Sequence, residues 1–438
     1  MPRTLAQMRL GLFIQAAGHH ASGWRYPGAQ SGSENVELIV QLARQAEQAK
    51  FDLVFFGDKL VTSAGEHPSM VVRLEPLVLL GALAMVTERI GLAATASTTY
   101  SEPYTLARQF GSLDMLSKGR AAWNVVTTGY DSAANFSRAT HPDHASRYAV
   151  AEEFVEVVRG LWDSFEDDAY VRDAHTGVYL DPAKMHRLDH AGAAFNVAGP
   201  LNLTRPPQGH PVLIQAGSSG PGMALAARIA EVVFTAQQSL ADAQAFYRAI
   251  KAQAVAHGRA AEHCLVMPGL MPIIGATRSE AQARFDRLQQ YNDLGAALGL
   301  VSERLGVDVS GFDLDQPLPP LPLPQNMLSR AQLLLELSHR DGLTLRQVAH
   351  LTAGARGHKI VVGTPAQVAE EMIAWFEGEA ADGFNLMPAY VPEGLSLFTE
   401  GVLPILRRHG LFRDEYSGST LREHLGLPRP ANRHTVSR

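Results

Sequence analysis

The sequence predicts an α/β fold, specifically a (β/α)8 TIM barrel, from three observations. Short β-rich runs alternate with helical patterns along the 438 residues, which favours βα units around a parallel sheet. Eight candidate strands are each followed by a helical pattern, which favours a closed barrel over an open doubly wound sheet. Polar residues gather where these strands end, and this is the edge of a barrel where functional residues lie.

The predicted strands are short runs in which β-branched, aromatic and other apolar residues predominate. In chain order they are RLGLFIQ (9–15), FDLVFFG (51–57), RIGLAATAS (89–97), RAAWNVVT (120–127), PVLIQA (211–216), EVVFTA (231–236), CLVMPGLMPII (264–274) and GFNLMP (383–388). The helices have apolar residues at the spacing of one helical face, as in SENVELIVQLARQAEQAK. We expect them at about 34–49, 73–87, 103–116, 145–163, 220–229, 240–256, 278–292, 364–379 and 396–409.

Two segments break the alternation and are predicted insertions within a single domain that spans residues 1–438. Residues 164–210, after the fourth βα unit, are polar and rich in Gly and Pro. Residues 293–357, after the seventh, contain PLPPLPLPQN and two amphipathic pieces. The proline run is typical of a stiff connector. Long insertions in barrels commonly cover the active face, so the second segment is expected to form a lid.

Composition and charge exclude several classes of function. The net charge of -6 and the lack of a long basic run argue against a nucleic-acid partner. No apolar stretch is long enough to span a bilayer, and the N-terminus lacks the pattern of a secretory signal. The single cysteine, Cys264, excludes an internal disulfide. We therefore expect a cytoplasmic protein without a membrane partner and without a metal site.

Polar side chains occupy the ends of the second, third and fourth predicted strands. Asp58 ends FFGD, Thr95 lies in AATAST, and Asn124 interrupts the apolar run AAWNVV. Each has a structural explanation: Asp58 as a helix cap, Thr95 as an ordinary strand residue, and Asn124 as an internal amide clamp. Because these strand ends meet at one edge of a barrel, their convergence predicts a shared ligand.

The run QAGSSGPG (215–222) follows the fifth predicted strand and leads into a helix. Its backbone N–H groups and the hydroxyls of Ser218 and Ser219 would face an anion at the helix N-terminus, with Gly217 in the turn. A plain glycine-rich turn with a serine cap is the alternative. The run matches neither a P-loop nor a dinucleotide fingerprint, so a mononucleotide phosphate is the favoured ligand.

Two further stretches carry functional side chains. In HPDHASRYAVAEEF, His144 and Tyr148 are four residues apart, so they share a helix face and are suited to a ligand's phosphate or sugar chain. A surface histidine and a packed tyrosine are the alternative. In GHHASGWRYP, after the first predicted strand, His19 or His20 is a candidate proton donor or substrate contact at the barrel mouth.

Together these motifs resemble the bacterial luciferase-like flavin-dependent monooxygenases, in the branch of nitrilotriacetate, dibenzothiophene-sulfone and long-chain alkane monooxygenases. The resemblance covers almost the whole chain. It rests on GHHASGWRYP, FDLVFFGD, TERIGLAATASTTYSEPYTLARQFGSLDMLSKGRAAWNVVTT, HASRYAVAEEF, RPPQGHPVLIQAGSSGPG and the tail YSGSTLREHLGLPRP.

The resemblance implies a barrel that binds reduced FMN supplied by a separate NAD(P)H:flavin reductase. The strand-end residues would surround the ring and ribityl chain, the helix pair would hold the ribityl–phosphate portion, and the glycine–serine turn would hold the phosphate. The implied cofactor-binding residues are Asp58, Thr95, Asn124, His144, Tyr148, Gly217, Ser218 and Ser219. His20 would be the catalytic histidine of the first loop, although the pair leaves open whether His19 fills that role.

The implied reaction is oxidation of a small organic substrate by O2 through a C4a-hydroperoxyflavin, in a homodimer or homotetramer. The implied substrates are of aminopolycarboxylate, organosulfur or hydrocarbon type. Two alternatives stay open: a deazaflavin-dependent oxidoreductase of the same superfamily, and a flavin-binding protein without catalytic activity.

Overall fold

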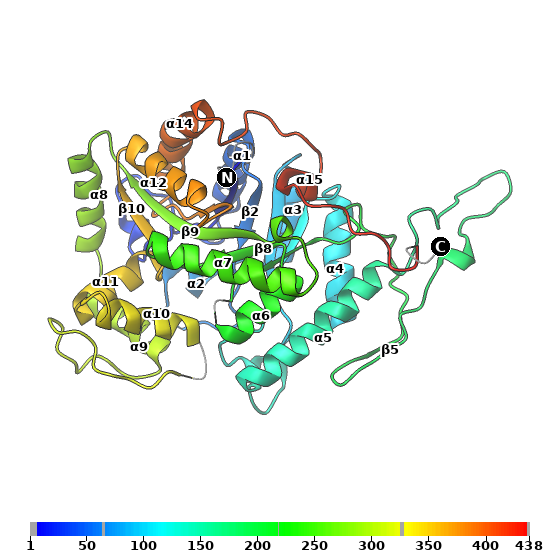
Figure 1. The fold of residues 1–438 in the computed structure, drawn as a ribbon, viewed down its shortest axis with the longest axis horizontal. Coiled ribbons are helices and arrows are strands. Elements are labelled where there is room, and N and C mark those ends of the chain that lie inside the picture. Colours follow the sequence, from blue (N-terminus) through cyan, green and yellow to red (C-terminus); the bar gives the residue numbers. More distant parts are fainter. Residues whose placement is uncertain (1–6, 64–65, 218, 325–327, 436–438) are drawn as a thin grey trace.

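The computed structural model describes residues 7–63, 66–217, 219–324 and 328–435, and these residues form a closed barrel of eight parallel strands (Figure 1). The strands are β1 (Arg9–Phe13), β2 (Leu53–Phe56), β3 (Gly91–Ser97), β4 (Ala121–Val126), β7 (Val212–Gln215), β8 (Val232–Thr235), β9 (Leu265–Ile274) and β11 (Gly383–Leu386). They pair in that order, and β11 pairs with β1 to close the barrel. All eight predicted strands are confirmed, and so is the predicted fold class.

Helices surround the barrel and follow the strands. They are α1 (Val36–Gln48), α2 (Pro68–Val71), α3 (Pro76–Ala84), α4 (Pro103–Leu116), α5 (His144–Trp162), α6 (Gly220–Ile229), α7 (Leu240–Ala256), α8 (Arg278–Gln290), α12 (Pro365–Glu377), α13 (Glu393–Leu397), α14 (Leu403–Arg408) and α15 (Leu421–Leu425). A π-helical turn, Phe398–Val402, joins α13 to α14. Within the described residues, no helix is both long and apolar enough to cross a membrane.

Alternate residues of each strand face the helices or the inside of the barrel, as the pleat requires. On β4, Trp123 packs outward, with its ring centroid 5.7 Å from that of Phe110 and 5.8 Å from that of Phe154. Ala122 belongs instead to the apolar cluster inside the barrel. Asn124, two residues along, therefore points inward as well, at the level where that apolar cluster gives way to polar residues.

A ninth strand, β10 (Lys359–Gly363), was not predicted from the sequence. It pairs in parallel with the second half of the long strand β9 and leads into α12. The preceding insertion folds into α9 (Leu294–Leu305), α10 (Leu328–His339) and α11 (Leu345–Ala355). These three helices share a small apolar core and lie together beside α8 (Figure 1).

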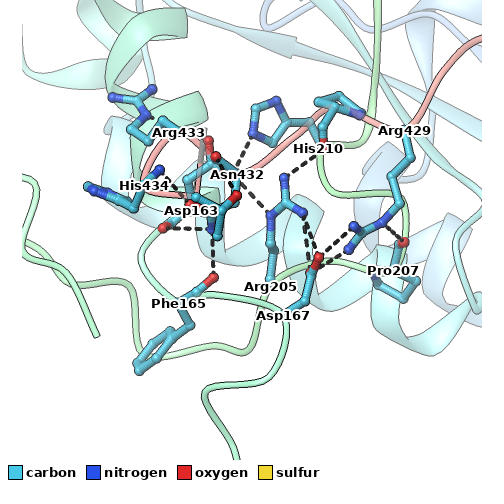
Figure 2. Close-up of polar contacts among 12 residues, drawn as sticks. Asp163, Phe165, Asp167, Arg205, Pro207, His210, Arg429, Asn432, Arg433 and His434 are labelled. Carbon is cyan, nitrogen blue, oxygen red and sulfur yellow. Dashed lines mark hydrogen bonds and ion pairs between the residues drawn. The ribbon is translucent and has the colours of Figure 1, made fainter. Parts of the chain in front are cut away.

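The other insertion, predicted over residues 164–210, fills the chain between the end of α5 and the start of β7. It extends away from the barrel with one short hairpin, β5 (His190–Ala191) and β6 (Asn196–Val197) (Figure 1). The C-terminal tail returns to its base. Figure 2 shows Asp163 there, with Arg205, His210 and Arg433 directed at its carboxylate and Asn432 bonding its backbone carbonyl. Charged contacts therefore join the end of the chain to the base of this insertion.

Candidate active site

A cavity of about 340 Å³ opens at the C-terminal ends of β4, β7 and β8. Its wall combines the loop after β4, the first turns of α5, the turn before α6, and the helix α10 of the second insertion. Gln332 and Glu336 are the polar residues that α10 contributes. The insertion thus covers part of this opening, as a lid would.

Four of the residues predicted to bind a cofactor meet in this cavity: His144, Tyr148, Gly217 and Ser219. Asp143 caps α5 by accepting the backbone N–H of Ser146 at 3.0 Å, so His144 lies in the first helical turn. The rings of His144 and Tyr148 lie on one helix face with their centroids 4.8 Å apart. Ser218 lies outside the described residues.

The turn before α6 brings two backbone segments into close contact. A Cβ atom on Gly217 would lie 2.9 Å from the Cα of Gly222, which is closer than a side chain tolerates. Ser219 caps α6 by accepting the backbone N–H of Gly222 at 3.2 Å. Glycine at both positions therefore lets the loop fold tightly, and it directs the positive end of the α6 dipole toward the cavity.

Arg147 is one of the cavity residues to which the sequence analysis assigned no role. It is three residues beyond His144, on the same helix face, and that spacing was the available signal. Its guanidinium lies 2.8 Å from Nε2 of His141 and donates to the carbonyl of Pro142 at 2.7 Å. Burial, with the neighbouring Arg147 charge, lowers the pKa of His144, so its ring is neutral at pH 7. The cavity wall therefore offers a fixed cation beside a neutral imidazole.

Thr95 and Asn124 lie deeper, inside the barrel on neighbouring strands. They occupy the same register of the β3–β4 pair, and the Asn124 amide donates to the Thr95 hydroxyl at 2.8 Å. The Asn124 side-chain oxygen is buried and accepts no hydrogen bond from the described residues. A buried amide oxygen without a donor costs about 1–3 kcal/mol. This cost would be relieved by a ligand that presents an N–H group.

The two histidines of the first loop are buried and neutral, and their Nε2 atoms differ in whether a described residue accepts their proton. Nε2 of His19 lies 2.8 Å from the carbonyl of Phe13, which fixes the proton on Nε2. His20 accepts the backbone N–H of Ser22 at Nδ1, so its proton is also on Nε2, where no described residue accepts it. The backbone around Gly354 of α11 covers His20, and neither ring lines the cavity.

Acid is expected to destabilise the protein through these rings. Burial lowers the pKa of His20 from 6.5 to about 3, so between these values the unfolded chain binds one proton more than the folded chain. Stability therefore falls as the pH falls below 6.5, by about 2 kcal/mol for this ring at pH 5. In His20→Gln, unfolding between pH 5 and 6 should take up about one proton fewer than in the unaltered protein. The free energy of unfolding, measured in urea, should therefore change less steeply with pH. In His175→Gln, which alters an exposed ring, the dependence should match that of the unaltered protein.

Asp58 lies outside the cavity wall, just after β2. Burial raises the pKa of its carboxyl, and the nearby Arg73 guanidinium opposes that rise. Arg73 donates to the carbonyl of Gly57 at 2.6 Å and so lies at the same strand end. The predicted residues thus fall into a group that lines the cavity, an inner pair of Thr95 and Asn124, and two separate positions, Asp58 and His20.

Comparison with known proteins identifies the family. A profile of the family described as luciferase-like monooxygenase matches residues 8–382. The chain is 50% identical over 433 residues to N-acetyl-S-(2-succino)cysteine monooxygenase of Bacillus subtilis (strain 168), with 98% of each chain covered. It is 47% identical to nitrilotriacetate monooxygenase component A of Aminobacter aminovorans, over 97% of this chain and 98% of the relative.

Solved structures agree with the sequence matches. A riboflavin lyase solved with modified FMN and its substrate riboflavin superposes with a TM-score of 0.88 at 36% identity, covering 98% of each chain. EDTA monooxygenase from Chelativorans sp. BNC1 superposes with a TM-score of 0.83 at 33% identity, covering 97% of this chain and 100% of that one. The expected resemblance is confirmed: the chain belongs to the luciferase-like monooxygenase family and is a flavin-dependent oxidoreductase.

Proposed function

We propose that this protein is a two-component monooxygenase that uses reduced FMN and O2 to oxidise a small organic substrate. The observation that carries the proposal is the cavity in which Arg147, His144, Tyr148 and the N-terminus of α6 converge. A cation beside a helix N-terminus is suited to a phosphate monoester, and FMN differs from riboflavin by that group.

The residues present fit FMN on two independent grounds. The turn before α6 folds tightly because a Cβ at Gly217 or Gly222 would clash with the other glycine, and this fold presents the backbone N–H groups at the start of α6 to a phosphate. The Asn124 side-chain oxygen lacks a donor, and the polar edge of a flavin ring carries an N–H group. Thr95, which already bonds the other end of that amide, would hold Asn124 in the orientation that accepts it.

Each part of the site then has a distinct role. Arg147 and the α6 N-terminus bind the phosphate, while His144 and Tyr148 hold the chain that connects it to the ring. When bound, reduced FMN supplies the electrons that activate O2. The helix α10 limits access of water to the cavity. His20 is the proposed donor through Nε2, whose N–H no described residue accepts.

The reductant is proposed to come from a separate NAD(P)H:flavin reductase. The name of the Aminobacter relative, component A, marks it as one component of a larger system. The relatives' names also span aminopolycarboxylate, organosulfur and hydrocarbon substrates, including dibenzothiophene-sulfone monooxygenases from Rhodococcus and a long-chain alkane monooxygenase from Geobacillus. We propose that the substrate of this chain belongs to one of these classes.

Assembly into a homodimer or homotetramer is part of the proposal. The helices α3 and α4, with the residue Met85 that follows α3, expose several large apolar side chains, including Val78 at 76%, Met85 at 73% and Leu116 at 56%. Burial of such side chains against a second copy would remove apolar area from water. Analytical ultracentrifugation of the purified chain measures the state directly.

The proposed function is tested by reconstitution. The purified chain with FMN, NADH and a flavin reductase should consume O2 and yield an oxygenated product with a panel of nitrilotriacetate, N-acetyl-S-(2-succino)cysteine, dibenzothiophene sulfone and a long-chain alkane. Oxygen uptake and product mass are measured with and without the reductase. Oxidation of NADH by this chain alone, or binding of the deazaflavin cofactor in preference to FMN, would count against the proposal.

A further inference from the structure

Arg304, in the last turn of α9, is a buried cation that the proposed flavin site does not use. It is 7% exposed, and its Nη1 atom is fully buried without a hydrogen-bond partner among the described residues. No ion pair to a described carboxylate satisfies it either, although Glu303 and Glu66 are close enough for their charges to act on it. Since a buried guanidinium stays protonated, it needs an acceptor to offset the cost of leaving water.

The neighbouring cation, Lys59, is fully satisfied by contrast. Its ammonium forms ion pairs with Glu66 and, at 3.1 Å, with Glu303, and it lies 4.0 Å from the ring centroid of Tyr130. These carboxylates thus bond Lys59 directly and give Arg304 only longer-range attraction. The contacts also fix the place of Arg304, because they tie α9 to the loops that follow β2 and β4.

These loops lie next to the cavity described above. Thr127, Thr128 and Gly129 line that cavity, and Tyr130, the next residue along the chain, covers Lys59. The amide of Asn135 in the same loop donates to the carbonyl of Leu60 at 3.0 Å, so the two loops are joined. An organic anion held by Arg304 would therefore lie at the carboxyl edge of the barrel, beside the proposed cofactor.

We propose that Arg304 binds a carboxylate group of the substrate and so selects aminopolycarboxylates and related dicarboxylic or tricarboxylic acids over neutral sulfones and hydrocarbons. The inference rests on the proposed function for the identity of the reaction, but the binding step is independent of it. A carboxylate oxygen is the acceptor that Nη1 lacks, and a guanidinium engages carboxylates through parallel hydrogen bonds. Lys59 remains bound to its two glutamates and positions the loops around the site.

The test compares each acid with its own methyl ester. Isothermal titration calorimetry of the FMN-saturated protein, with nitrilotriacetate or N-acetyl-S-(2-succino)cysteine as the probe, should give affinities for the free acids at least tenfold higher than for the methyl esters. In Arg304→Gln the affinity for the acids should fall roughly tenfold or more, because a hydrogen bond between charged groups is lost. Arg304→Lys should retain part of the difference between acid and ester.

Arg346→Gln is the matched control. Arg346 is also in the second insertion, but it is 41% exposed and pairs with Asp315 on the surface, so this variant should bind the acids as the unaltered protein does. Equal affinity for acid and ester, unchanged acid binding in Arg304→Gln, or binding of dibenzothiophene sulfone or an alkane in place of both acids would overturn the proposal. Should Arg304→Gln fail to fold, the ester comparison and Arg304→Lys decide the outcome. FMN binding, measured on the same samples by fluorescence, reports separately on the proposed cofactor.

Discussion

Replacement of Arg147 by glutamine is expected to weaken FMN binding by roughly 10- to 100-fold while leaving riboflavin binding nearly unchanged. Arg147 is the fixed cation in the wall of the cavity, and a hydrogen bond between charged groups contributes about 1.5–3 kcal/mol. Because riboflavin lacks the phosphate, it has no partner for this guanidinium. The dissociation constants of both ligands, measured by flavin fluorescence quenching, give the ratio that isolates the phosphate contact.

Two variants make this expectation specific. Arg138→Gln removes a cation from the loop that precedes α5, where Arg138 lies over the Tyr100 ring outside the cavity wall, and it should leave both affinities unchanged. Arg147→Lys keeps the charge but not the planar fork, so it should restore part of the FMN affinity. Equal weakening of FMN and riboflavin would instead mean that Arg147 supports the wall of the cavity through His141.

The barrel was predictable because its signal is local. Each strand combines β-branched and aromatic residues over a few positions, and amphipathic helices separate the strands, so all eight strands could be placed from the sequence. The strand β10 was not predicted because KIVVG (359–363) directly follows the insertion and leads at once into α12, so it does not stand out as a separate βα unit. Its pairing with β9 joins residues about 90 positions apart, and no local pattern encodes that contact.

The same difference between local patterns and long-range contacts decides which parts of the candidate site could be predicted. His144 and Tyr148 are linked by helical spacing, and Gly217 and Ser219 by one turn, so the sequence alone brought each pair together. That these pairs share a cavity with Arg147 depends on how α5 and α6 pack beside one another around the barrel.

Contacts made by the second insertion could not be predicted from the sequence. The burial of His20 follows from the position of α11, which approaches from more than 300 residues along the chain. The covering of the cavity by α10 and the placement of Arg304 beside the loop after β2 likewise need the fold of the insertion as a whole.

The second large effect is expected at the base of the first insertion, where Asp163→Ala should lower the free energy of unfolding by about 3–5 kcal/mol. The Asp163 carboxylate is 2% exposed and lies 3.1 Å from Nε of Arg205 and 3.0 Å from Nε2 of His210. Arg205 is equally buried, so removal of the carboxylate leaves the Nε of its guanidinium without an acceptor, while Nη1 keeps Asp167 and Nη2 keeps the carbonyl of Pro430 (Figure 2). Urea unfolding followed by circular dichroism measures the change.

The same variant should loosen the C-terminal tail without affecting the cavity. Arg433 loses its partner 3.6 Å away, and amide hydrogen exchange in residues 428–435 should therefore accelerate while FMN affinity is retained. Asp168→Ala is the control, because Asp168 pairs with Lys184 at the surface of the same insertion and is 72% exposed. Removing an exposed pair changes stability little. If both variants unfolded at the same urea concentration, burial would not be what gives the Asp163 cluster its strength, and the tail would be held by its apolar contacts instead.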